Sequence, residues 1–323
     1  MTLVCRIDHP RIKIGLIAGL GVVASSLVPV GAATLPISEG SLYYRVRGEG
    51  TPILLLTGGP GRSGDYLEPV FVHLAKSYRV ILPDQRGTGR SKLHTLDANT
   101  VTVGKNVADL ETLRMSLGIE KWIIMGHSWG GMLAMLYTVE HPDRVRSLVL
   151  VGSGGTTLDF FSRSDGMLRK RQTPEEVNLI KAWEKEARDP ARREEAQLEV
   201  KKLMTGPYLY DRGTLPAVTE TLTPQTYSSR TAELILKDLR TTKYDLRQGL
   251  HAAITGAFGK RPILILHGEQ DAIGLSTEHE LKAMFPAASV RILDQCGHFP
   301  SLEATRAFFA ELDKFLPRSG SDQ

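Results

Sequence analysis

Short apolar runs alternate with helical patterns along most of the chain. The β-rich runs are Leu42 to Arg47, Ile53 to Leu56, Arg79 to Leu82, Trp122 to Met125, Leu148 to Val151, Pro262 to Leu266 and Val290 to Leu293. Uninterrupted runs such as Ile53 to Leu56 indicate strands covered on both faces, which is how parallel sheets are built. The helical patterns between them are Asp65 to Lys76, Val103 to Leu117, Trp129 to Glu140, Leu275 to Met284 and Ser301 to Phe315. The alternation predicts a doubly wound, mostly parallel α/β sheet.

This alternation stops near Gly152 and resumes near Lys260. Between these positions lie two strongly charged helical patterns, Pro174 to Ala187 and Pro190 to Met204. Residues 159–212 hold 12 basic and 11 acidic side chains, a balance typical of a solvated outer face. We therefore expect a helical cap at one edge of the sheet, where it could select substrates. The expected organisation is a leader over 1–32, a core segment over 33–152, the cap over 153–259 and a second core segment over 260–323.

The N-terminal region has the pattern of an export signal. An apolar stretch from Ile12 to Ala33 follows three basic residues and ends in small ones, as in a secretory signal peptide. We expect cleavage after Ala32 or Ala33, with no stable membrane insertion afterwards. An uncleaved membrane anchor is the alternative, because about 20 apolar residues can span a bilayer. Either way, we expect the body of the chain to be exported, to the periplasm or out of the cell.

Composition narrows the class of protein. With 41% hydrophobic and 24% charged residues, the chain is globular rather than disordered, collagen-like or disulfide-rich. Its formal charge of +4 comes partly from the leader, and no basic stripe indicates nucleic-acid binding. Loss of Cys5 with the leader would leave Cys296 alone, so no internal disulfide is expected. No cluster of His, Cys and carboxylates has metal-ligand spacing, and neither a metal nor a cofactor is predicted.

The segment richest in chemistry is GHSWG at residues 126–130, a GxSxG motif between an apolar strand and a helix. That context is the one the motif requires as a nucleophile turn. Ser128 must sit on a sharp, strained turn, and side chains at 126 and 130 would collide with the neighbouring strand and helix. The turn presents the hydroxyl at the carboxyl end of the sheet, where open α/β sheets bind ligands. The amide of Trp129 then lies at a helix N-terminus, where it can stabilise an oxyanion.

A base and an acid should follow the nucleophile in the order Ser, acid, His. His298 lies in the loop between the last predicted strand and the final helix, a placement that no other histidine shares. Because a serine hydroxyl is a poor nucleophile without a base to accept its proton, we expect His298 to be that base. Asp271 comes just after the strand from Pro262 to Leu266 and is expected to orient the imidazole. Glu269 is the competing carboxylate.

The first buried strand runs into the loop Thr57-Gly58-Gly59-Pro60-Gly61. A loop in this position can supply the second oxyanion amide, for which we expect Gly59, with Pro60 fixing the loop. A phosphate-binding loop is excluded, because neither a following Lys-Ser or Lys-Thr pair nor a GxGxxG spacing is present.

Five features together resemble the α/β-hydrolase superfamily and, within it, the proline iminopeptidase group. They are GGPG at 58–61, DQRGTGRS at 84–91, GHSWGG at 126–131, Asp271 and Gly297-His298. The resemblance covers nearly all of the chain outside the leader and cap. It implies a serine mechanism without a cofactor, which removes an N-terminal residue, often proline, from a short peptide or a small amino-acid amide. Thr57 stands where the oxyanion loop of this group usually has His.

Members of the group recognise the free α-ammonium of the substrate with carboxylates that lie partly in the cap. The cap of this chain does not align with theirs by eye. Glu220 and Glu233 are candidates for such carboxylates, although a solvated position on a helix face is favoured for each. Within residues 84–91, Arg86 and Arg90 are expected to pair with nearby carboxylates rather than to contact substrate.

Two other functions stay open. A carboxylesterase acting on small acyl esters would use the same machinery, and a non-catalytic binding protein could use the same fold. Cap carboxylates converging over Ser128 would favour a substrate ammonium, whereas an apolar cavity would favour an acyl ester. The serine at 128 argues against haloalkane dehalogenases and epoxide hydrolases, which need a carboxylate at that position.

Overall fold

The computed structural model describes residues 31–316, in which the strands form one sheet. Its order is β1-β2-β4-β3-β6-β7-β8-β9, with β5 paired to β2. The strands are β1 (Gly31–Ile37), β2 (Gly40–Arg47), β3 (Pro52–Leu56), β4 (Arg79–Pro83), β5 (Lys92–Leu93), β6 (Trp122–His127), β7 (Val145–Val151), β8 (Ile263–Gly268) and β9 (Ser289–Leu293). Strands β1, β2 and β5 pair antiparallel, whereas every pairing from β4 through β9 is parallel. The predicted doubly wound, mostly parallel α/β sheet is confirmed.

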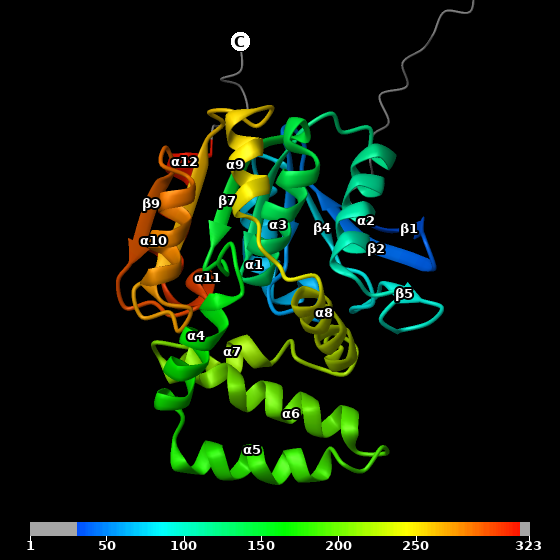
Figure 1. Cartoon of the computed structure of the whole chain (residues 1–323), viewed down its shortest axis with the longest axis vertical. Helices are drawn as coiled ribbons and strands as arrows, with labels where there is room; N and C mark the ends of the chain where they lie inside the picture. Colours follow the sequence, from blue (N-terminus) through cyan, green and yellow to red (C-terminus); the bar gives the residue numbers. More distant parts are fainter. Residues whose placement is uncertain (1–30, 317–323) are drawn as a thin grey trace, which may run out of the picture.

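Helices cover both faces of this sheet (Figure 1). Those packed on it are α1 (Glu68–Leu74), α2 (Val103–Ser116), α3 (Trp129–Glu140), α9 (Arg247–Thr255), α10 (Leu275–Met284), α11 (Pro300–Glu303) and α12 (Thr305–Phe315). Leu54 and Leu56 of β3 belong to the core under α2, α3, α9 and α10, whereas Ile53 and Leu55 belong to the core under α1 and α12. All four side chains are fully buried, and each burial contributes about 2 kcal/mol. Because successive side chains of β3 enter cores on opposite faces of the sheet, none of these four positions is polar.

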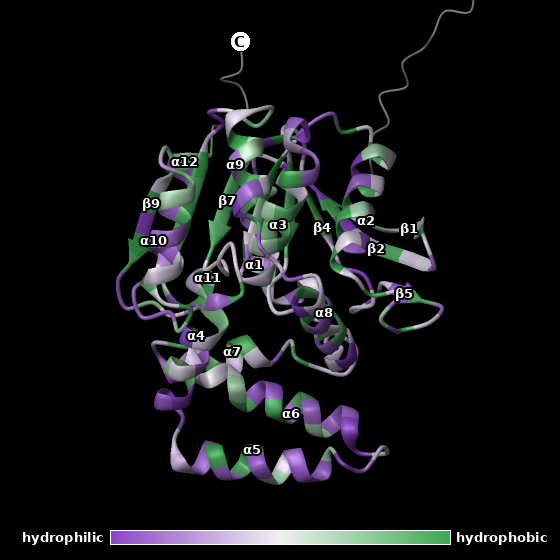
Figure 2. Cartoon of the chain, viewed as in Figure 1, coloured by the Kyte–Doolittle hydropathy of each residue, from purple (hydrophilic) through white to green (hydrophobic). Residues whose placement is uncertain are grey.

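The cap lies beyond the carboxyl ends of the parallel strands (Figure 1). It contains α4 (Asp159–Arg171), α5 (Pro174–Glu186), α6 (Arg193–Thr205), α7 (Leu215–Thr219) and α8 (Ser229–Thr241). Short 3-10 helices complete the chain: η1 (Gly64–Leu67), η2 (Pro142–Arg144), η3 (Gly206–Tyr208) and η4 (Arg212–Thr214). Helix α5 starts at a capping box, in which Thr173 and Glu176 bond each other's backbone amides. Helices α5 and α6 pack together, and Figure 2 shows them largely hydrophilic, as their balanced charge predicts.

Several elements differ from the sequence prediction. The segment predicted as one helix from 65 to 76 starts as η1 and becomes α1 only at Glu68. The helix predicted from 301 to 315 breaks at Ala304, whose φ of −123° lies outside the helical region, into α11 and α12. Helix α9 lies before the expected end of the cap at 259, yet it packs on α3, with Leu250 fully buried in the main core. Apolar periodicity does not show where a helix is interrupted or which layer it joins.

Strand β1 was not predicted, and it includes two residues of the expected leader. It pairs with β2 from Gly31 to Ile37, so Gly31 and Ala32 of the expected leader lie at the edge of the sheet. The first four residues of β1 are exposed. The rest of the expected leader lies outside the described residues. Among residues 31–316, no helix is long and apolar enough to cross a membrane.

Candidate active site

Ser128 occupies the turn between β6 and α3, as the GxSxG motif predicts. Its φ of 55° and ψ of −119° are strained for a residue with a side chain. The turn is tight because a Cβ on Gly126 would lie 2.2 Å from the Gly130 carbonyl oxygen, and one on Gly130 would lie 2.4 Å from that of Leu56. Both glycines are therefore required by close backbone approach. This tight turn places Ser128 in the wall of a cavity.

His298 and Asp271 meet beside this cavity. Nδ1 of His298 lies 2.8 Å from Oδ2 of Asp271, and the other carboxylate oxygen accepts the Ile273 amide at 2.9 Å. Burial by itself would raise the pKa of Asp271. The nearby His298 and His267 together with these hydrogen bonds outweigh burial and lower that pKa. The ionised carboxylate fixes the imidazole with its Nδ1 proton toward Asp271.

The competing carboxylate, Glu269, is exposed and accepts a hydrogen bond from the side chain of Gln270. The structure thus brings Asp271, and not Glu269, to His298. Ser128 and His298 line the same cavity. Among the described residues, no hydrogen bond joins the Ser128 hydroxyl to the imidazole.

The two residues expected to supply the oxyanion amides line the same cavity as Ser128. Gly59 has a φ of 53° and lines the cavity, as does Trp129 at the first position of α3. A helix amide at that position has no partner within its own helix. The neighbouring Gly58 amide donates instead to the hydroxyl of Tyr66 at 2.6 Å, which leaves it unsuited to an oxyanion.

A buried chain of hydrogen bonds connects the three loops of the site. The Tyr66 hydroxyl, which accepts from Gly58, lies 2.7 Å from Nδ1 of His127, and Nε2 of His127 lies 2.7 Å from the carbonyl oxygen of His298. Since that carbonyl only accepts, Nε2 carries the proton, and Nδ1 accepts from Tyr66. Burial lowers the pKa of His127 to about 3, so this ring is neutral. Sequence reasoning missed this role, although the position of His127 beside Ser128 was a signal.

Gln85 ties the oxyanion loop to the nucleophile helix. Its Nε2 donates to the carbonyl and hydroxyl oxygens of Thr57, each at 3.0 Å, and its Oε1 accepts from the Trp129 indole at 2.7 Å. Thr57, which replaces the usual His, also donates its hydroxyl to the carbonyl of Arg62 at 3.0 Å. The loop is therefore held by side-chain bonds that suit threonine.

The arginines of the 84–91 run have structural partners, as expected. Arg86 is fully buried and makes a two-pronged ion pair with Asp109, at 2.6 and 2.8 Å. Arg90 bonds Asp84 at 2.7 Å and Asp65 at 2.8 Å. Neither arginine lines the cavity, and none of these carboxylates does. Cys296 is a buried packing residue.

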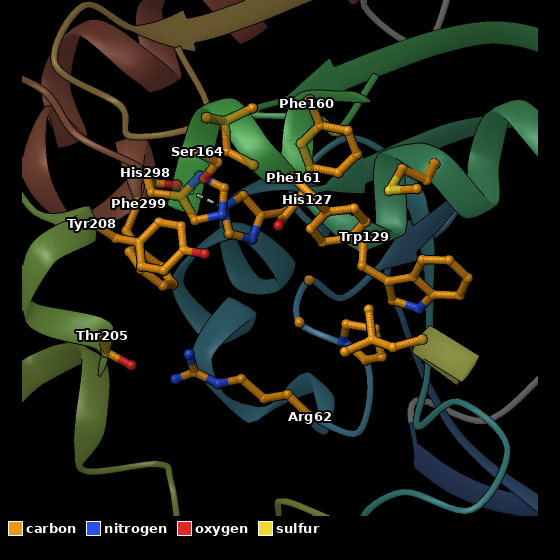
Figure 3. Close-up of a pocket in the computed structure, with 18 of the residues that line it drawn as sticks. Arg62, His127, Trp129, Phe160, Phe161, Ser164, Thr205, Tyr208, His298 and Phe299 are labelled. Atoms are coloured by element: carbon orange, nitrogen blue, oxygen red, sulfur yellow. Dashed lines mark hydrogen bonds between the residues drawn. The ribbon is translucent and has the colours of Figure 1, made fainter. Parts of the chain in front are cut away.

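The cavity encloses about 180 Å³ and lies between the sheet edge and the cap (Figure 3). Its walls are mostly apolar and aromatic, and Trp129, Phe160 and Tyr208 are among the aromatic side chains that line it. None of the described lining residues is Asp or Glu, whereas Arg62 and Lys201 both line it. Among residues 31–316, no group of His, Cys, Asp and Glu is placed to hold a metal ion.

Glu220 and Glu233 lie away from this cavity. Glu220 borders a shallow outer groove that also includes Asp65 and Glu68. Glu233 is half exposed, accepts a hydrogen bond from Gln197 at 2.8 Å and lies 3.5 Å from Arg230. Both therefore have the solvated positions that the sequence favoured.

Comparison with known proteins places this geometry in a family. A family model described as the alpha/beta hydrolase fold matches residues 51–305. A proline iminopeptidase of Xylella fastidiosa is 44% identical over 113 residues, which is 34% of this chain and 36% of that protein. One of Neisseria meningitidis is 39% identical over 127 residues, 38% of this chain and 40% of that protein. The chain thus matches about two fifths or less of the length of these relatives.

Solved structures agree on the fold. The proline iminopeptidase-related protein of Thermus thermophilus superposes with a TM-score of 0.69 at 23% identity, covering 88% of this chain and 96% of that one. A meta-cleavage product hydrolase of Pseudomonas fluorescens IP01 gives 0.67 at 20% identity, covering 88% and 96%. With the matched family model, the nucleophile turn and the sheet order all in agreement, this chain belongs to the α/β-hydrolase family and resembles its proline iminopeptidases.

Proposed function

We propose that this protein is a serine hydrolase that cleaves acyl bonds through a covalent intermediate on Ser128. One observation carries the proposal: a strained serine and an imidazole bonded to a buried carboxylate open into the same cavity. Few other roles explain why a chain would keep a serine in a disfavoured conformation next to such a pair.

In the proposed reaction, Ser128 Oγ attacks the substrate carbonyl carbon while Nε2 of His298 takes the hydroxyl proton. Asp271 keeps the imidazole oriented and stabilises its positive charge. Collapse of the tetrahedral intermediate breaks the bond to the leaving group, which receives the proton from His298. Water, activated by the same imidazole, then hydrolyses the acyl-enzyme and restores Ser128. The amides of Gly59 and Trp129 donate to the oxyanion in both halves.

Two more specific activities are candidates, and they differ in the acyl group and the leaving group of the substrate. The relatives named proline iminopeptidase support release of an N-terminal residue. That activity needs a negative group near the scissile bond to hold the α-ammonium, and no described lining residue supplies one. The apolar and positively charged lining favours an acyl substrate without an ammonium group, such as a small ester. We place ester hydrolysis first and aminopeptidase activity second on this ground.

A fluorophosphonate probe followed by a substrate panel tests the proposal. We expect the probe to label wild-type protein at Ser128 and to leave Ser128→Ala unlabelled, although both fold with the same melting temperature. Absence of labelling in the folded wild type would instead support a non-catalytic binding protein. The panel compares p-nitrophenyl acetate with the p-nitroanilides of proline and alanine. Turnover of the free-amine anilides above that of the ester would restore the aminopeptidase as first candidate.

A further inference from the structure

Two cationic side chains line the cavity, and neither has a carboxylate partner among the described residues. Arg62 comes from the loop after β3, and Lys201 comes from α6 of the cap. They belong to different layers of the molecule, so only the folded chain brings them to one cavity. The proposed acyl-transfer mechanism uses neither of them.

Arg62 is a buried cation with incomplete hydrogen bonding. Its side chain is covered, with the residue only 4% exposed, and one guanidinium nitrogen donates to Val218 O at 2.5 Å and Thr221 Oγ1 at 2.9 Å. Its Nε has no hydrogen-bond partner among the described residues. The guanidinium packs over Tyr66, 4.0 Å from the ring centre, and Phe299, at 5.8 Å. Burying a charge without an opposite charge is costly, so such a group is suited to bind an anion.

Burial also changes the pKa of Arg62. Removal from water lowers the pKa of Arg62 to about 10, which still leaves it charged at neutral pH. Figure 3 shows its guanidinium reaching toward the cap wall that carries Thr205 and Tyr208. The charged end therefore points into the space between sheet and cap.

Lys201 lies over the oxyanion loop. Its Nζ is 3.9 Å from the point where a Cβ on Gly59 would lie, and among the described residues it makes no hydrogen bond or ion pair. The next residue, Lys202, does pair with Glu199, at 2.7 Å. Burial, with a smaller contribution from Arg62, lowers the pKa of Lys201 to about 8, so most of it is charged at pH 7. A solvated lysine on an outer helix face would not lie against Gly59.

We propose that Arg62 and Lys201 form a subsite for a carboxylate of the substrate, beside the oxyanion amide of Gly59. This inference rests on the proposed serine hydrolase and specifies its substrate: an acyl compound that carries a carboxylate on its acyl or leaving-group side. A guanidinium fork and an ammonium group can bind the two oxygens of one carboxylate with charge-assisted hydrogen bonds. The same two charges repel an α-ammonium.

Matched esters test the subsite on each side of the scissile bond. The acyl-side pair is the p-nitrophenyl monoester of glutarate and p-nitrophenyl hexanoate; the leaving-group pair is 4-acetoxybenzoate and 4-methylphenyl acetate. The readout is the ratio of kcat/KM for the charged ester to that for the neutral ester, in wild type and in Lys201→Met. We expect the variant to lower this ratio roughly tenfold to a hundredfold in at least one pair. A change below twofold in both pairs would overturn the inference.

Lys202→Met is the matched control, because Lys202 lies on the same helix but does not line the cavity. Its ratios are expected to stay within twofold of wild type. If Lys201→Met instead slows the charged and neutral esters equally, the lysine acts on the oxyanion or on the fold, and the subsite is rejected. Melting temperatures of both variants separate loss of folding from loss of recognition.

A binding measurement separates this inference from the proposed function. Calorimetry with benzoate and with glutarate on the intact wild-type protein requires no turnover. We expect at least one of them to bind, and binding to weaken about tenfold in Lys201→Met. Absence of binding for both overturns the subsite even if Ser128 is reactive. Binding by a protein whose Ser128 the fluorophosphonate does not label would keep the subsite and reject the hydrolase.

Discussion

Buried side chains around the cavity hold different charges because their neighbours differ. Asp271 stays ionised since two histidines and two hydrogen bonds outweigh the effect of burial on its pKa. For His127, burial lowers the pKa by more than the hydrogen bond to the His298 carbonyl and the charge of Asp271 raise it, so the ring stays neutral with a pKa of about 3. Lys201 lies between these cases, with its pKa lowered to about 8. The chemistry of the site therefore depends on residue environments that the sequence does not display.

The first prediction concerns the acid of the proposed triad. Asp271→Asn is expected to lower kcat for an active ester roughly a thousandfold or more, because an amide no longer fixes the imidazole tautomer or stabilises its charge. Glu269→Gln is the control, since this competing carboxylate is exposed and does not contact His298. Its kcat should stay within twofold of wild type. Equal losses in the two variants would contradict the assignment of Asp271.

The second prediction is a pH dependence of anion recognition. Because the pKa of Lys201 is about 8, its charge is present below that pH and is lost as pH rises through it. The substrate carboxylate is ionised throughout this range. The ratio of kcat/KM for the charged ester to that for the neutral ester should therefore fall between pH 7 and pH 9 in wild type. In Lys201→Met this ratio should not change with pH.

Other titratable groups in the cavity do not produce that change. The pKa of Arg62 is about 10, burial raises those of Tyr66 and Tyr208 to about 12, and His127 is neutral. His298 takes part in the hydrolysis of both esters, so its effect cancels in the ratio of their kcat/KM values. A preference that rises with pH, or falls equally in the variant, would contradict the role of Lys201.

At the scale of elements, the junction of β6 and α3 governs the position of the nucleophile. A helix can begin immediately after Ser128 only because β3, β6 and α3 approach one another at glycine backbones. Sequence predicted this strand-turn-helix unit correctly, with the bounds of α3 from Trp129 to Glu140 as observed. The unit is predictable because its pattern is contiguous and each glycine has a local steric reason.

The third prediction tests the close approach of α3 to β3 by comparing two helical glycines, one at this contact and one in open space. Gly130→Ala is expected to destabilise the fold by about 1–3 kcal/mol and to lower kcat, because its Cβ would meet Leu56 O at 2.4 Å and push α3 away from β3. Gly104→Ala in α2 has nothing within 4 Å of the new Cβ, so it should be neutral or stabilising by up to about 1 kcal/mol. Urea unfolding and ester turnover measure both effects. Equal stabilities would show that α3 adjusts freely.

Edge strands and helix interruptions escaped the sequence prediction. Strand β1 is mostly exposed and contains small residues, and β5 has two residues, so neither shows an apolar alternation. Their pairing with β2 is decided by the backbone hydrogen bonds of a neighbouring strand. Periodicity detects burial against a core, and these strands are only slightly buried.

At the scale of the whole molecule, one buried arginine connects distant segments. The Arg86 side chain is fully covered and bonds Asp109 of α2, Glu39 of the β1–β2 turn, and the Thr100 carbonyl at 3.0 Å. Sequence analysis predicted carboxylate partners for Arg86 without identifying them. Because the partners come from three segments, this network holds the N-terminal hairpin against the rest of the sheet.

The fourth prediction follows from that network. Arg86→Met should destabilise the protein by about 3–5 kcal/mol, because Asp109 would stay buried without its counter-charge. Arg169→Met is the control, since the Arg169 side chain is exposed and, within residues 31–316, its ion pair is with Asp165 one turn away. Its melting temperature should match wild type. A similar melting temperature for both variants would show that the buried network adds no stability.

The fifth prediction concerns export. We propose that the chain is exported and that its leader is removed after Ala32 or Ala33. Expressed in a bacterium with its full sequence, the protein should appear in the periplasm or the medium with an N-terminus at Ala33 or Thr34. Loss of Gly31 to Ala33 removes only exposed residues of β1, so a chain beginning at Thr34 should keep its melting temperature within a few degrees. Recovery of unprocessed protein that only detergent extracts would support the membrane-anchor alternative.

Sequence by itself determined the sheet class and the nucleophile turn, because each rests on a contiguous pattern. The order of residues at strand ends favoured Asp271 as the partner of His298, with Glu269 as the competitor. The structure decided between these carboxylates, since Asp271 contacts the imidazole whereas Glu269 is exposed.

Tertiary structure alone decided the sign of charge in the cavity. Arg62 lies in a loop of the sheet layer and Lys201 in the cap, and the candidate carboxylates Glu220 and Glu233 are directed away. Which side chains of a cap face inward depends on how two layers pack, and no spacing along one chain encodes that directly.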